Sequence, residues 1–404
     1  MKILFLNPSA QLGGAERCIA EMCRVLSQQN MLCKVVIGEP GPLQGEAQRQ
    51  GAETEVLEFP QELKAWGDSS LKGKSRGHLA LGMVKQGAKA LGPMCKYAKA
   101  LQKIVEQWQP DIVHSHGVKM HLLSSLAQVG AARRVWHLHD FLGTRPLAGK
   151  LLRWRSGGVQ LALGVSQAVA DDAQQVLPSV QVQTLYNAVD TDYFSPGSGD
   201  PQRLDQLAEL PPAAVGTVRI GLVAAYAKWK GHSLFLQAAA ALQRRSPIPL
   251  RFYVIGGPIY ATAGSQYTEE ELQEVAFELN LSEQMGFVGF QSDIAWVYRS
   301  LDIVVHCSTQ PEPFGRTIAE AMSCGRPVIA AETGGAAELF TSQVDAWGIP
   351  ANDAEQLAES ILTLATQPTL WPALSENARQ TALRRFSLDR LGKELTAAYR
   401  SVIT

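Results

Sequence analysis

Cysteine is scarce in this chain, with six residues among 404, and no two of them have the C-x-x-C spacing. This excludes a dense disulfide framework and a cysteine-rich metal module. We therefore expect reduced, mostly buried thiols, as in a cytoplasmic protein. Long apolar runs are also missing, since none approaches the roughly 18 residues of a membrane-spanning helix. The apolar run at the N-terminus meets Asn7 and Pro8 at once, so it predicts a buried strand and not a signal peptide.

Net charge is small as well, with a formal value of −1 at pH 7. That balance gives no support for nucleic acid as a partner. The charges are nevertheless unevenly distributed. Residues 1–190 contain 21 Lys and Arg against 15 Asp and Glu, and the remainder contains 16 against 23. A basic N-terminal half can attract an anionic surface, either membrane lipid or a phosphate-bearing acceptor.

What recurs along the chain is a short aliphatic run, followed by a Gly-rich turn and a longer helical pattern. This alternation predicts an α/β fold in which parallel sheets are covered on both faces. The first predicted helix runs from Glu16 to Gln28, and another begins near Ser166. The predicted strands are 2–6, 35–37, 54–57, 111–114, 135–139, 161–165, 219–223, 251–255, 285–288, 303–306 and 327–330.

The alternation stops and restarts around a stretch rich in turn residues, 190–216, which we interpret as a linker. A chain of 404 residues is too long for one ordinary core, so two domains are expected. We predict two Rossmann-like domains, 1–188 and 189–375, that face each other across a cleft, with helices at 376–404 packing back towards the first. Ligands of such folds lie beyond the carboxyl ends of the strands.

Two carboxylates, Glu312 and Glu320, lie eight residues apart around a predicted loop-to-helix junction at Phe314-Gly315-Arg316. A helix N-terminus presents unpaired N–H groups and a partial positive charge, which suit a phosphate. Carboxylates accept paired hydrogen bonds from the neighbouring hydroxyls of a ribose or a hexose. A phosphate between two hydroxyl-bearing rings describes a nucleotide sugar, and the element therefore predicts a nucleotide-sugar site.

Two further elements follow predicted strand ends. Gly13 and Gly14 open a predicted helix and let the backbone approach a diphosphate closely. The pair lacks the third glycine of a dinucleotide fingerprint, so NAD or FAD binding is poorly supported. Lys228 and Lys230 precede the first helix of the second domain and can place positive charge beside phosphates. Each element alone would fit an ordinary turn or surface, but their common position after strands favours a ligand role.

Four histidines form two H-x-H pairs, His114 with His116 and His137 with His139. Alternate residues of a strand share a face, so each pair could in principle chelate a metal. No Asp or Cys cluster completes such a site in the sequence, and we predict no metal. His139 with Asp140, at a strand end, is better suited to hydrogen bonding with substrate hydroxyls.

Two basic segments with interspersed apolar residues, 72–103 and 145–155, lie in the N-terminal half. The first contains no acidic residue at all. Such a pattern favours a helix that covers the sheet with a solvated lysine face, and it also fits a helix that contacts an anionic membrane surface. Periodicity does not separate these two alternatives.

Taken together, these residues resemble the retaining nucleotide-sugar glycosyltransferases of glycosyltransferase family 4, which have the GT-B fold of two Rossmann-like domains. The similarity spans almost the whole chain. It is carried by the glycine loop 13–17, the strand-end histidines, the hinge signature 187–190, the Lys230-Gly231 pair, and the segment from Glu312 through Gly334-Gly335 to Glu338.

The resemblance implies a role for each matching residue. The catalytic residues would be His139 at the reacting face of the sugar, Glu312 on the transferred sugar, and Lys230 on the diphosphate. Glu320 would bind the ribose hydroxyls. The donor-binding residues would be Gly14, Lys228, Lys230, Phe314, Gly315, Arg316, Thr317 and Glu320, and the acceptor-binding residues would be Gly13, His116 and Asp140. The resemblance implies no metal ion and no cofactor beyond the UDP- or GDP-sugar donor.

The implied activity is retaining transfer of a hexose or related sugar to a glycan, lipid-linked or other hydroxyl acceptor in polysaccharide or cell-envelope synthesis. The acceptor would bind the first domain and the donor the second, in the cytoplasm or at the inner face of the membrane. Many relatives carry an arginine where this chain has Ala225, and Lys228 is a candidate substitute. Two alternatives stay open: a sugar-nucleotide 2-epimerase, and a non-catalytic sugar-nucleotide-binding protein.

Overall fold

The computed structural model describes residues 1–64, 76–258 and 264–403. For residues 64 and 76–89 it describes the backbone but not the side chains. The chain divides into two compact units. Unit 1 comprises Met1–Asn187 with Leu388–Thr404, and unit 2 comprises Ala188–Ser387. The domain boundary expected from the sequence at 375/376 falls inside helix α14 (Trp371–Phe386), which belongs to unit 2. Only α15 (Leu388–Ile403) joins unit 1.

Unit 1 is built on a seven-stranded sheet in the order β3-β2-β1-β4-β5-β6-β7, and every neighbouring pair is parallel. Its strands are β1 (Lys2–Asn7), β2 (Leu32–Ile37), β3 (Glu53–Val56), β4 (Ile112–His116), β5 (Arg133–Leu138), β6 (Leu161–Gly164) and β7 (Val182–Thr184). The prediction of a parallel sheet is therefore confirmed for this half of the chain. Strand β7 was missed by the sequence analysis.

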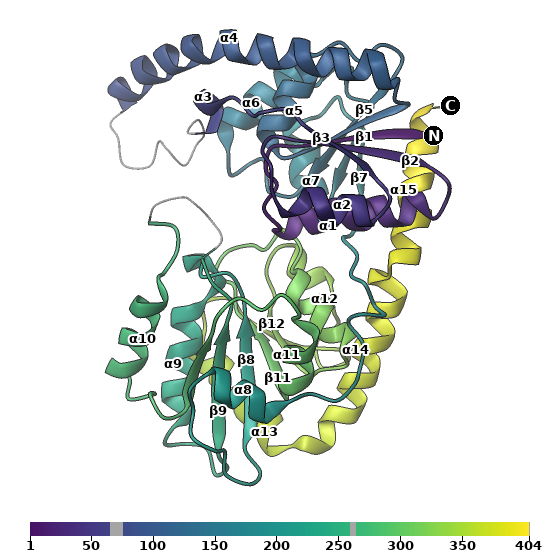
Figure 1. The fold of residues 1–404 in the computed structure, drawn as a ribbon. Coiled ribbons are helices and arrows are strands. Elements are labelled where there is room, and N and C mark those ends of the chain that lie inside the picture. Colours follow the sequence, from purple (N-terminus) through teal and green to yellow (C-terminus); the bar gives the residue numbers. More distant parts are fainter. Residues whose placement is uncertain (65–75, 259–263, 404) are drawn as a thin grey trace. The chain divides into compact units, whose positions relative to one another are not determined.

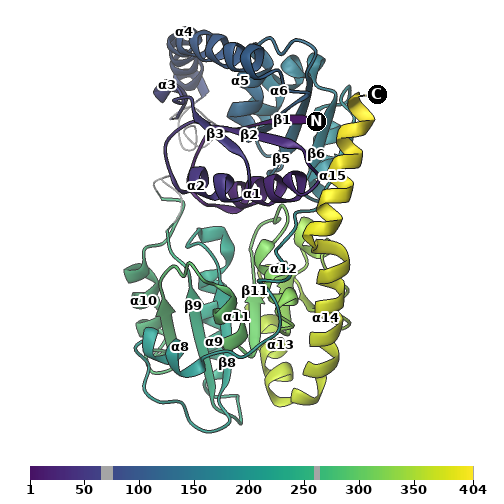
Figure 2. The same ribbon diagram turned by 45° about the vertical axis from the view of Figure 1, so that its right-hand side comes forward.

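Helices cover both faces of this sheet. Helices α1 and α2 lie on one face and α4, α5 and α6 on the other (Figures 1 and 2). Helix α15 packs beside α1, where Thr396 Oγ1 donates to Gln29 Oε1 at 2.8 Å. The helix predicted to begin near Ser166 is α7, and Ser166 caps it by accepting from the N–H of Val169. The helices are α1 (Gly14–Ser27), α2 (Pro42–Arg49), α3 (Gln61–Lys64), α4 (Arg76–Trp108), α5 (Val118–Leu126), α6 (Pro146–Arg155), the 3₁₀ turn η2 (Ser156–Gly158) and α7 (Gln167–Val176).

Unit 2 repeats this architecture with a six-stranded parallel sheet in the order β10-β9-β8-β11-β12-β13. Two predicted strands, β10 and β11, match the structure residue for residue, and the three-residue β13 was missed. The strands are β8 (Val218–Val223), β9 (Leu250–Ile255), β10 (Met285–Val288), β11 (Ile303–His306), β12 (Val328–Ala331) and β13 (Trp347–Ile349).

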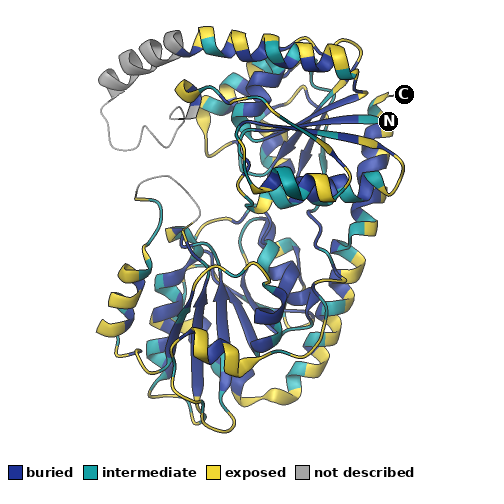
Figure 3. Cartoon of the chain, viewed as in Figure 1, coloured by how far each residue is buried: buried dark blue, intermediate teal, exposed yellow. Residues whose placement is uncertain are grey.

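The helices of unit 2 pack around this sheet, α9 against α10 and α13, and α12 against α14. Strand β9 is buried along its whole length, as expected for a parallel strand covered on both faces. Figure 3 shows the same contrast between the buried central strands of unit 2 and the exposed outer faces of its helices. The helices are α8 (Pro201–Leu207), η3 (Lys228–Lys230), α9 (His232–Leu242), α10 (Glu269–Glu278), α11 (Ala295–Ser300), α12 (Arg316–Ser323), η4 (Gly335–Glu338), α13 (Ala354–Thr366) and η5 (Pro368–Leu370), followed by α14.

The segment 190–216, interpreted from the sequence as a linker, is instead packed into unit 2 and contains α8. Asp205 on α8 is buried and pairs with Arg219 at 2.8 Å and Arg251 at 2.9 Å. It also accepts a hydrogen bond from Tyr253. A buried carboxylate needs such partners, so these contacts fix α8 against the ends of β8 and β9.

The described part of α4 favours the sheet-covering alternative for the first basic segment. Lys96, Lys99 and Lys103 are exposed, whereas Tyr97 and Leu101 are buried in unit 1. Most of the apolar side of this half of the helix is therefore covered by protein, although Leu91 is 61% exposed. For the rest of the first basic segment, residues 72–75 and the side chains of residues 76–89 are not among the described parts of the structure. No helix in the described ranges is both long and apolar enough to cross a bilayer.

Candidate functional site

Both sheets have a position where the strand order reverses, between β1 and β4 in unit 1 and between β8 and β11 in unit 2. Helices leave the sheet in opposite directions at such a point, which opens a crevice beyond the strand ends. In unit 2 the two loops that border this crevice contain Lys230, after β8, and Glu312, after β11. The topology thus brings together residues 82 positions apart in the sequence.

Lys230 and Glu312 form a bidentate ion pair. The Lys230 ammonium donates to both carboxylate oxygens of Glu312, at 2.9 and 2.8 Å. Their side chains are 18% and 8% exposed. Charges so far from water need partners in good geometry, and each of these two supplies the other's. The ammonium also lies 4.1 Å from the ring centroid of Trp229.

Two buried residues that the sequence analysis did not select complete the surroundings of Glu312. Ser308 Oγ donates to Glu312 Oε2 at 2.9 Å, and His306 Nε2 lies 3.3 Å from the same oxygen. Burial by itself would raise the pKa of Glu312, but the Lys230 charge and the contacts with His306 and Lys230 hold it well below its usual range. Glu312 is therefore an anion. His306 ends a correctly predicted strand at the switch point, which is the signal that could have identified it.

Two glycines allow the loops to approach each other. Gly231 has a φ of +84°, and a Cβ at this position would lie 1.9 Å from the carbonyl oxygen of Cys307. Gly334 has a φ of +60°, and a Cβ there would lie 2.6 Å from the carbonyl oxygen of Glu312. Larger residues would strain the backbone at both positions. The Gly335 N–H donates to that same Glu312 carbonyl at 2.7 Å, which fixes the loop that carries the carboxylate.

Helix α12 begins at Arg316, directly after the Glu312 loop, and its N-cap residue Gly315 offers no side-chain cap. In its first turn the Ile318 N–H donates to the Gly315 carbonyl at 3.0 Å. The start of a helix carries a partial positive charge that suits an anion. The side chain of Phe314 packs on Phe386, and Arg316 Nη1 donates to the Ala188 carbonyl at 3.0 Å. A role for the backbone amides of Phe314, Gly315, Arg316 and the half-buried Thr317 in donor binding stays a prediction.

Glu320 lies within α12 and is 8% exposed. It accepts a hydrogen bond from Tyr298 Oη at 2.9 Å, and Arg316 Nε lies 3.5 Å from its other oxygen. Burial, followed by the Glu320 charge, raises the pKa of Tyr298 well above its usual range, so this phenol stays a donor. These two contacts hold the carboxylate in place.

Lys228 has a different environment from Lys230. Its side chain is exposed and its ammonium lies 5.4 Å from the ring centroid of Tyr267. Its backbone N–H donates to Ser265 at 3.1 Å. Replacement of the missing arginine at Ala225 by Lys228 stays a prediction.

In unit 1, Gly13 and Gly14 lie at the start of α1, beyond the end of β1. Gly13 has no side chain with which to cap the helix, but the carboxylate of Glu16 accepts hydrogen bonds from the backbone N–H groups of Gly13 and Glu16. Glu16 in this turn accepts from Asn7 Nδ2 at 3.0 Å, and burial raises its pKa. The glycine pair thus has the strand-to-helix position that the sequence predicted.

His139 and Asp140 follow β5, and each already has a partner within unit 1. His139 Nε2 lies 2.9 Å from His116 Nδ1, and Asp140 pairs with Arg145 at 3.0 Å. Asp140 is half-exposed, whereas His116 is 0% exposed. His116, expected among the acceptor-binding residues, is thus fully buried with His139 as its neighbour, and its contact with an acceptor stays a prediction. A cleft shared by these residues and those of unit 2 stays a prediction.

Acid should destabilise this protein through a histidine beside the Lys230 loop. Burial first, and then the Lys230 charge, lower the pKa of His232 to about 4, against about 6.5 in an unfolded chain. Between pH 6.5 and 4, the His232 imidazole is therefore protonated in the unfolded state but neutral in the folded state. This contribution is negligible above pH 6.5 and costs roughly 3 kcal/mol as the pH falls to 4.

Guanidinium unfolding of the wild type and of His232→Gln between pH 7.5 and 4 measures this effect. The wild type is expected to lose roughly 3 kcal/mol more of its unfolding free energy than the variant. Other buried histidines titrate in both proteins and cancel in the comparison. Parallel pH profiles would contradict the assignment.

Comparison with known proteins places each half of the chain in a family model. Residues 12–193 match the model described as Glycosyltransferase Family 4, and residues 213–381 match Glycosyl transferases group 1. A D-inositol 3-phosphate glycosyltransferase of Saccharomonospora viridis is 32% identical over 55% of this chain and 50% of its own length. One of Actinosynnema mirum is 29% identical over 76% of this chain and 77% of its own. The chain spans about half the length of the first of these relatives.

Solved structures resemble the whole chain in fold. The Anabaena protein Alr3699/HepE in complex with UDP-glucose has a TM-score of 0.78 and 23% identity, with coverage of 99% of this chain and 100% of that one. A glycosyltransferase from Rickettsia africae has a TM-score of 0.78 and 21% identity, with 100% and 98% coverage. These likenesses establish the fold, and the order of the strands in both sheets agrees with it.

Proposed function

Because the chain belongs to the family 4 glycosyltransferases of the GT-B fold, we propose that it moves a hexose or related sugar from a UDP- or GDP-sugar to a hydroxyl acceptor, with retention of configuration. The donor would bind unit 2 and the acceptor unit 1. A uridine donor is the first to test, since the Anabaena structure was solved with UDP-glucose. The relatives named for D-inositol 3-phosphate, and the basic N-terminal half, favour an acceptor that carries phosphate.

The Lys230–Glu312 ion pair is the observation that carries this proposal. It lies at the switch point of unit 2, beside the uncapped first turn of α12. A diphosphate would take Lys230 as its counterion, and the α12 amides would surround it. Glu312 would then release the Lys230 ammonium and accept hydrogen bonds from sugar hydroxyls, while Ser308 keeps its carboxylate in position. Glu320, one turn further along α12, would accept hydrogen bonds from the ribose.

The reaction follows from this arrangement. The bond between the sugar C1 and the diphosphate oxygen breaks, and a bond from C1 to the acceptor oxygen forms on the same face of the ring. The departing phosphate takes the proton of the acceptor hydroxyl. Negative charge grows on the diphosphate only as the bond breaks, so Lys230 and the amides would stabilise the transition state more than the bound donor. These groups supply the positive charge of the step, and the proposal routes none of it through a metal ion.

His139 would lie at the reacting face of the sugar, with its orientation set by the hydrogen bond to His116. Gly13 and Asp140 would contact the acceptor from the same strand ends of unit 1. An imidazole held by a neighbour can donate to a sugar hydroxyl or stabilise positive charge on the ring.

Ligand-induced thermal shift with UDP, GDP, ADP and their sugars tests the donor, since a ligand that binds only the folded state raises its stability. Product analysis with and without an acceptor then separates the three functions. Transfer or slow donor hydrolysis with α-configured product supports the proposal. Conversion of the donor to its 2-epimer without acceptor identifies an epimerase, and binding without turnover identifies a non-catalytic subunit.

We further propose a peripheral contact with anionic membrane through the second basic segment, 145–155. On helix α6, Trp154 is 74% exposed and Leu147 is 42% exposed. Lys150 and Arg153 are exposed on the same helix. Indole rings favour the headgroup region, and each basic residue near an anionic surface is worth about 1 kcal/mol.

Vesicle co-sedimentation tests this contact. Replacement of Lys150 and Arg153 by Gln is expected to weaken binding to phosphatidylserine-containing vesicles about 10- to 30-fold, since two cations are lost. Trp154→Ala should weaken it several-fold. Phe277→Ala, which removes an equally exposed aromatic ring on α10 of unit 2, is the matched control and should bind like the wild type. Equal binding of all variants, or binding unaffected by salt, would overturn the contact.

A further inference from the structure

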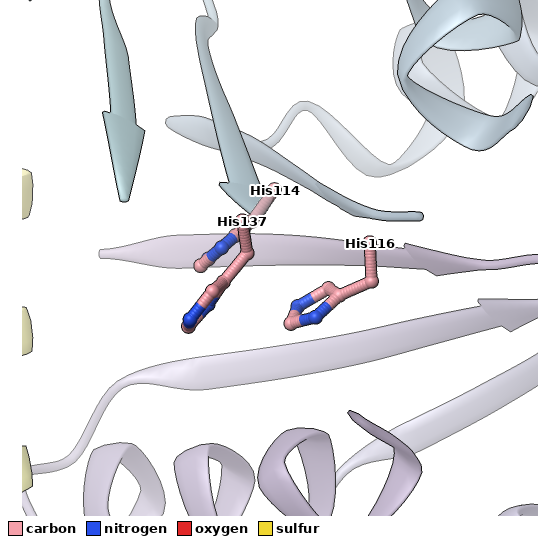
Figure 4. Close-up of side chains that lie close together, drawn as sticks. All are labelled: His114, His116 and His137. Atoms are coloured by element: carbon pink, nitrogen blue, oxygen red, sulfur yellow. The ribbon is translucent and has the colours of Figure 1, made fainter. Parts of the chain in front are cut away.

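The three histidines His114, His116 and His137 lie together in the interior of unit 1 (Figure 4). His114 and His116 alternate along β4, so they share a face of the sheet. His137 is the register partner of His116 on the neighbouring strand β5. One nitrogen from each of the three rings lies within 4.8 Å of the others, and each side chain is 0% exposed.

Unpartnered nitrogen atoms distinguish this cluster from an ordinary polar core. Nε2 of His114, Nε2 of His116, and both ring nitrogens of His137 are buried without a hydrogen-bond partner. Buried polar atoms are almost always paired, and each unpaired one destabilises the fold. Four such atoms from three adjacent rings point to a ligand that accepts nitrogen lone pairs.

The remaining nitrogens are held as in metal sites. Nδ1 of His114 lies 2.6 Å from the hydroxyl of Tyr399 on α15, and Nδ1 of His116 lies 2.9 Å from His139. In the tautomer with hydrogen on Nδ1, both contacts are donated by the ring, and the Nε2 lone pairs are available. Metal-bound histidines usually have their second nitrogen in such a hydrogen bond, which fixes the ring and its tautomer.

We propose that His114, His116 and His137 bind one zinc-type divalent ion through three imidazole nitrogens. Imidazole suits Zn²⁺, Cu²⁺ and Ni²⁺, whereas Mg²⁺ and Ca²⁺ prefer oxygen ligands. Zinc–nitrogen bonds of about 2.0–2.1 Å require nitrogens about 3.4 Å apart in a tetrahedral site. The rings of His114 and His137 are now stacked at 5.2 Å, so rotation about χ2, a soft torsion for histidine, would close the site.

The ion would be structural. It would join β4 to β5, and through the second nitrogens of its ligands it would support Tyr399 of α15 on one side and His139 on the other. The H-x-H spacing raised this possibility in the sequence, but without a fourth ligand it favoured no metal. The structure shows that the two pairs lie on the neighbouring strands β4 and β5, so that three of the four rings lie close together. The inference rests on unit 1 alone and does not depend on the proposed donor chemistry.

Metal titration of the full-length, tag-free protein after chelator treatment tests the inference. Isothermal titration and elemental analysis are expected to give one Zn²⁺ per chain, with no binding of Mg²⁺. His137→Gln should weaken zinc at least 100-fold. His121→Gln is the matched control, because His121 is equally buried in unit 1 but bonds Ser115 at 2.8 Å. It should keep the wild-type stoichiometry.

X-ray absorption of the zinc-loaded wild type gives a second measurement should His137→Gln fail to fold. Three imidazole nitrogens at about 2.0 Å are expected. Absence of stoichiometric binding, wild-type affinity in His137→Gln, or a shell with fewer than three imidazoles would each overturn the site.

Discussion

Lys230→Ala is expected to lower the rate of sugar transfer by about 10²–10³-fold, the usual cost of losing one group that stabilises growing negative charge. The Lys230 ammonium is the cation that pairs with Glu312 at the switch point of unit 2. Its loss removes the counterion of the diphosphate. Lys230→Arg should recover part of the rate, since the charge returns with a different shape. Steady-state kinetics with a saturating acceptor measures both variants.

The same substitution should also destabilise unit 2, because it leaves the Glu312 carboxylate buried without its cation. Breaking a buried pair from one side costs about 3–5 kcal/mol. Lys230→Met combined with Glu312→Gln removes both charges and should recover most of that loss in denaturant unfolding. The double variant would stay inactive. Unchanged turnover by a folded Lys230→Ala protein would remove Lys230 from the mechanism.

Glu320→Ala should abolish productive donor binding. A carboxylate that accepts two ribose hydroxyls contributes about 1.5–3 kcal/mol for each hydrogen bond, so kcat/KM is expected to fall about 10²–10⁴-fold. The nucleoside diphosphate should lose affinity to a similar extent, whether or not it carries a sugar. Calorimetry with UDP and GDP measures this directly.

Tyr298→Phe is the control for Glu320, because it deletes the hydroxyl that donates to the carboxylate at 2.9 Å and leaves the carboxylate itself. Its effect on nucleotide affinity should be less than about 10-fold, the size of one hydrogen bond. Nucleotide binding by Glu320→Ala at wild-type affinity would assign the ribose to another residue.

The fold was largely predictable because buried parallel strands are nearly continuous aliphatic runs. Ile303–His306 and Met285–Val288 were predicted with their observed ends. The missed strands, Val182–Thr184 and Trp347–Ile349, are three residues long and lie at sheet edges, where burial imposes little pattern. Segment 190–216 was misjudged because turn-forming residues at Ser195–Pro201 conceal the short helix that follows.

Sequence reasoning could select candidate residues where they have a recognisable neighbourhood in the sequence, as Glu312 and Glu320 do, and their ligand roles stay predictions. Ser308 and His306 were not selected, since neither carries a motif and their role depends on contact with Glu312 across a loop. The Lys230–Glu312 bond itself joins loops from two different strands. Such pairing follows from strand order, which the local pattern of residues does not specify.

Because α15 completes unit 1 after unit 2 has intervened, the two units cannot mature in the order in which they are translated. Leu391, Leu395 and Tyr399 of α15 fill the interior of unit 1, and Gly392 packs beside Val25 of α1. At ~5–20 residues per second, the roughly 200 residues of unit 2 occupy the ribosome for roughly 10–40 s. During that interval the side of α1 that packs on α15 lacks its partner, and chaperones are expected to bind the nascent first unit there.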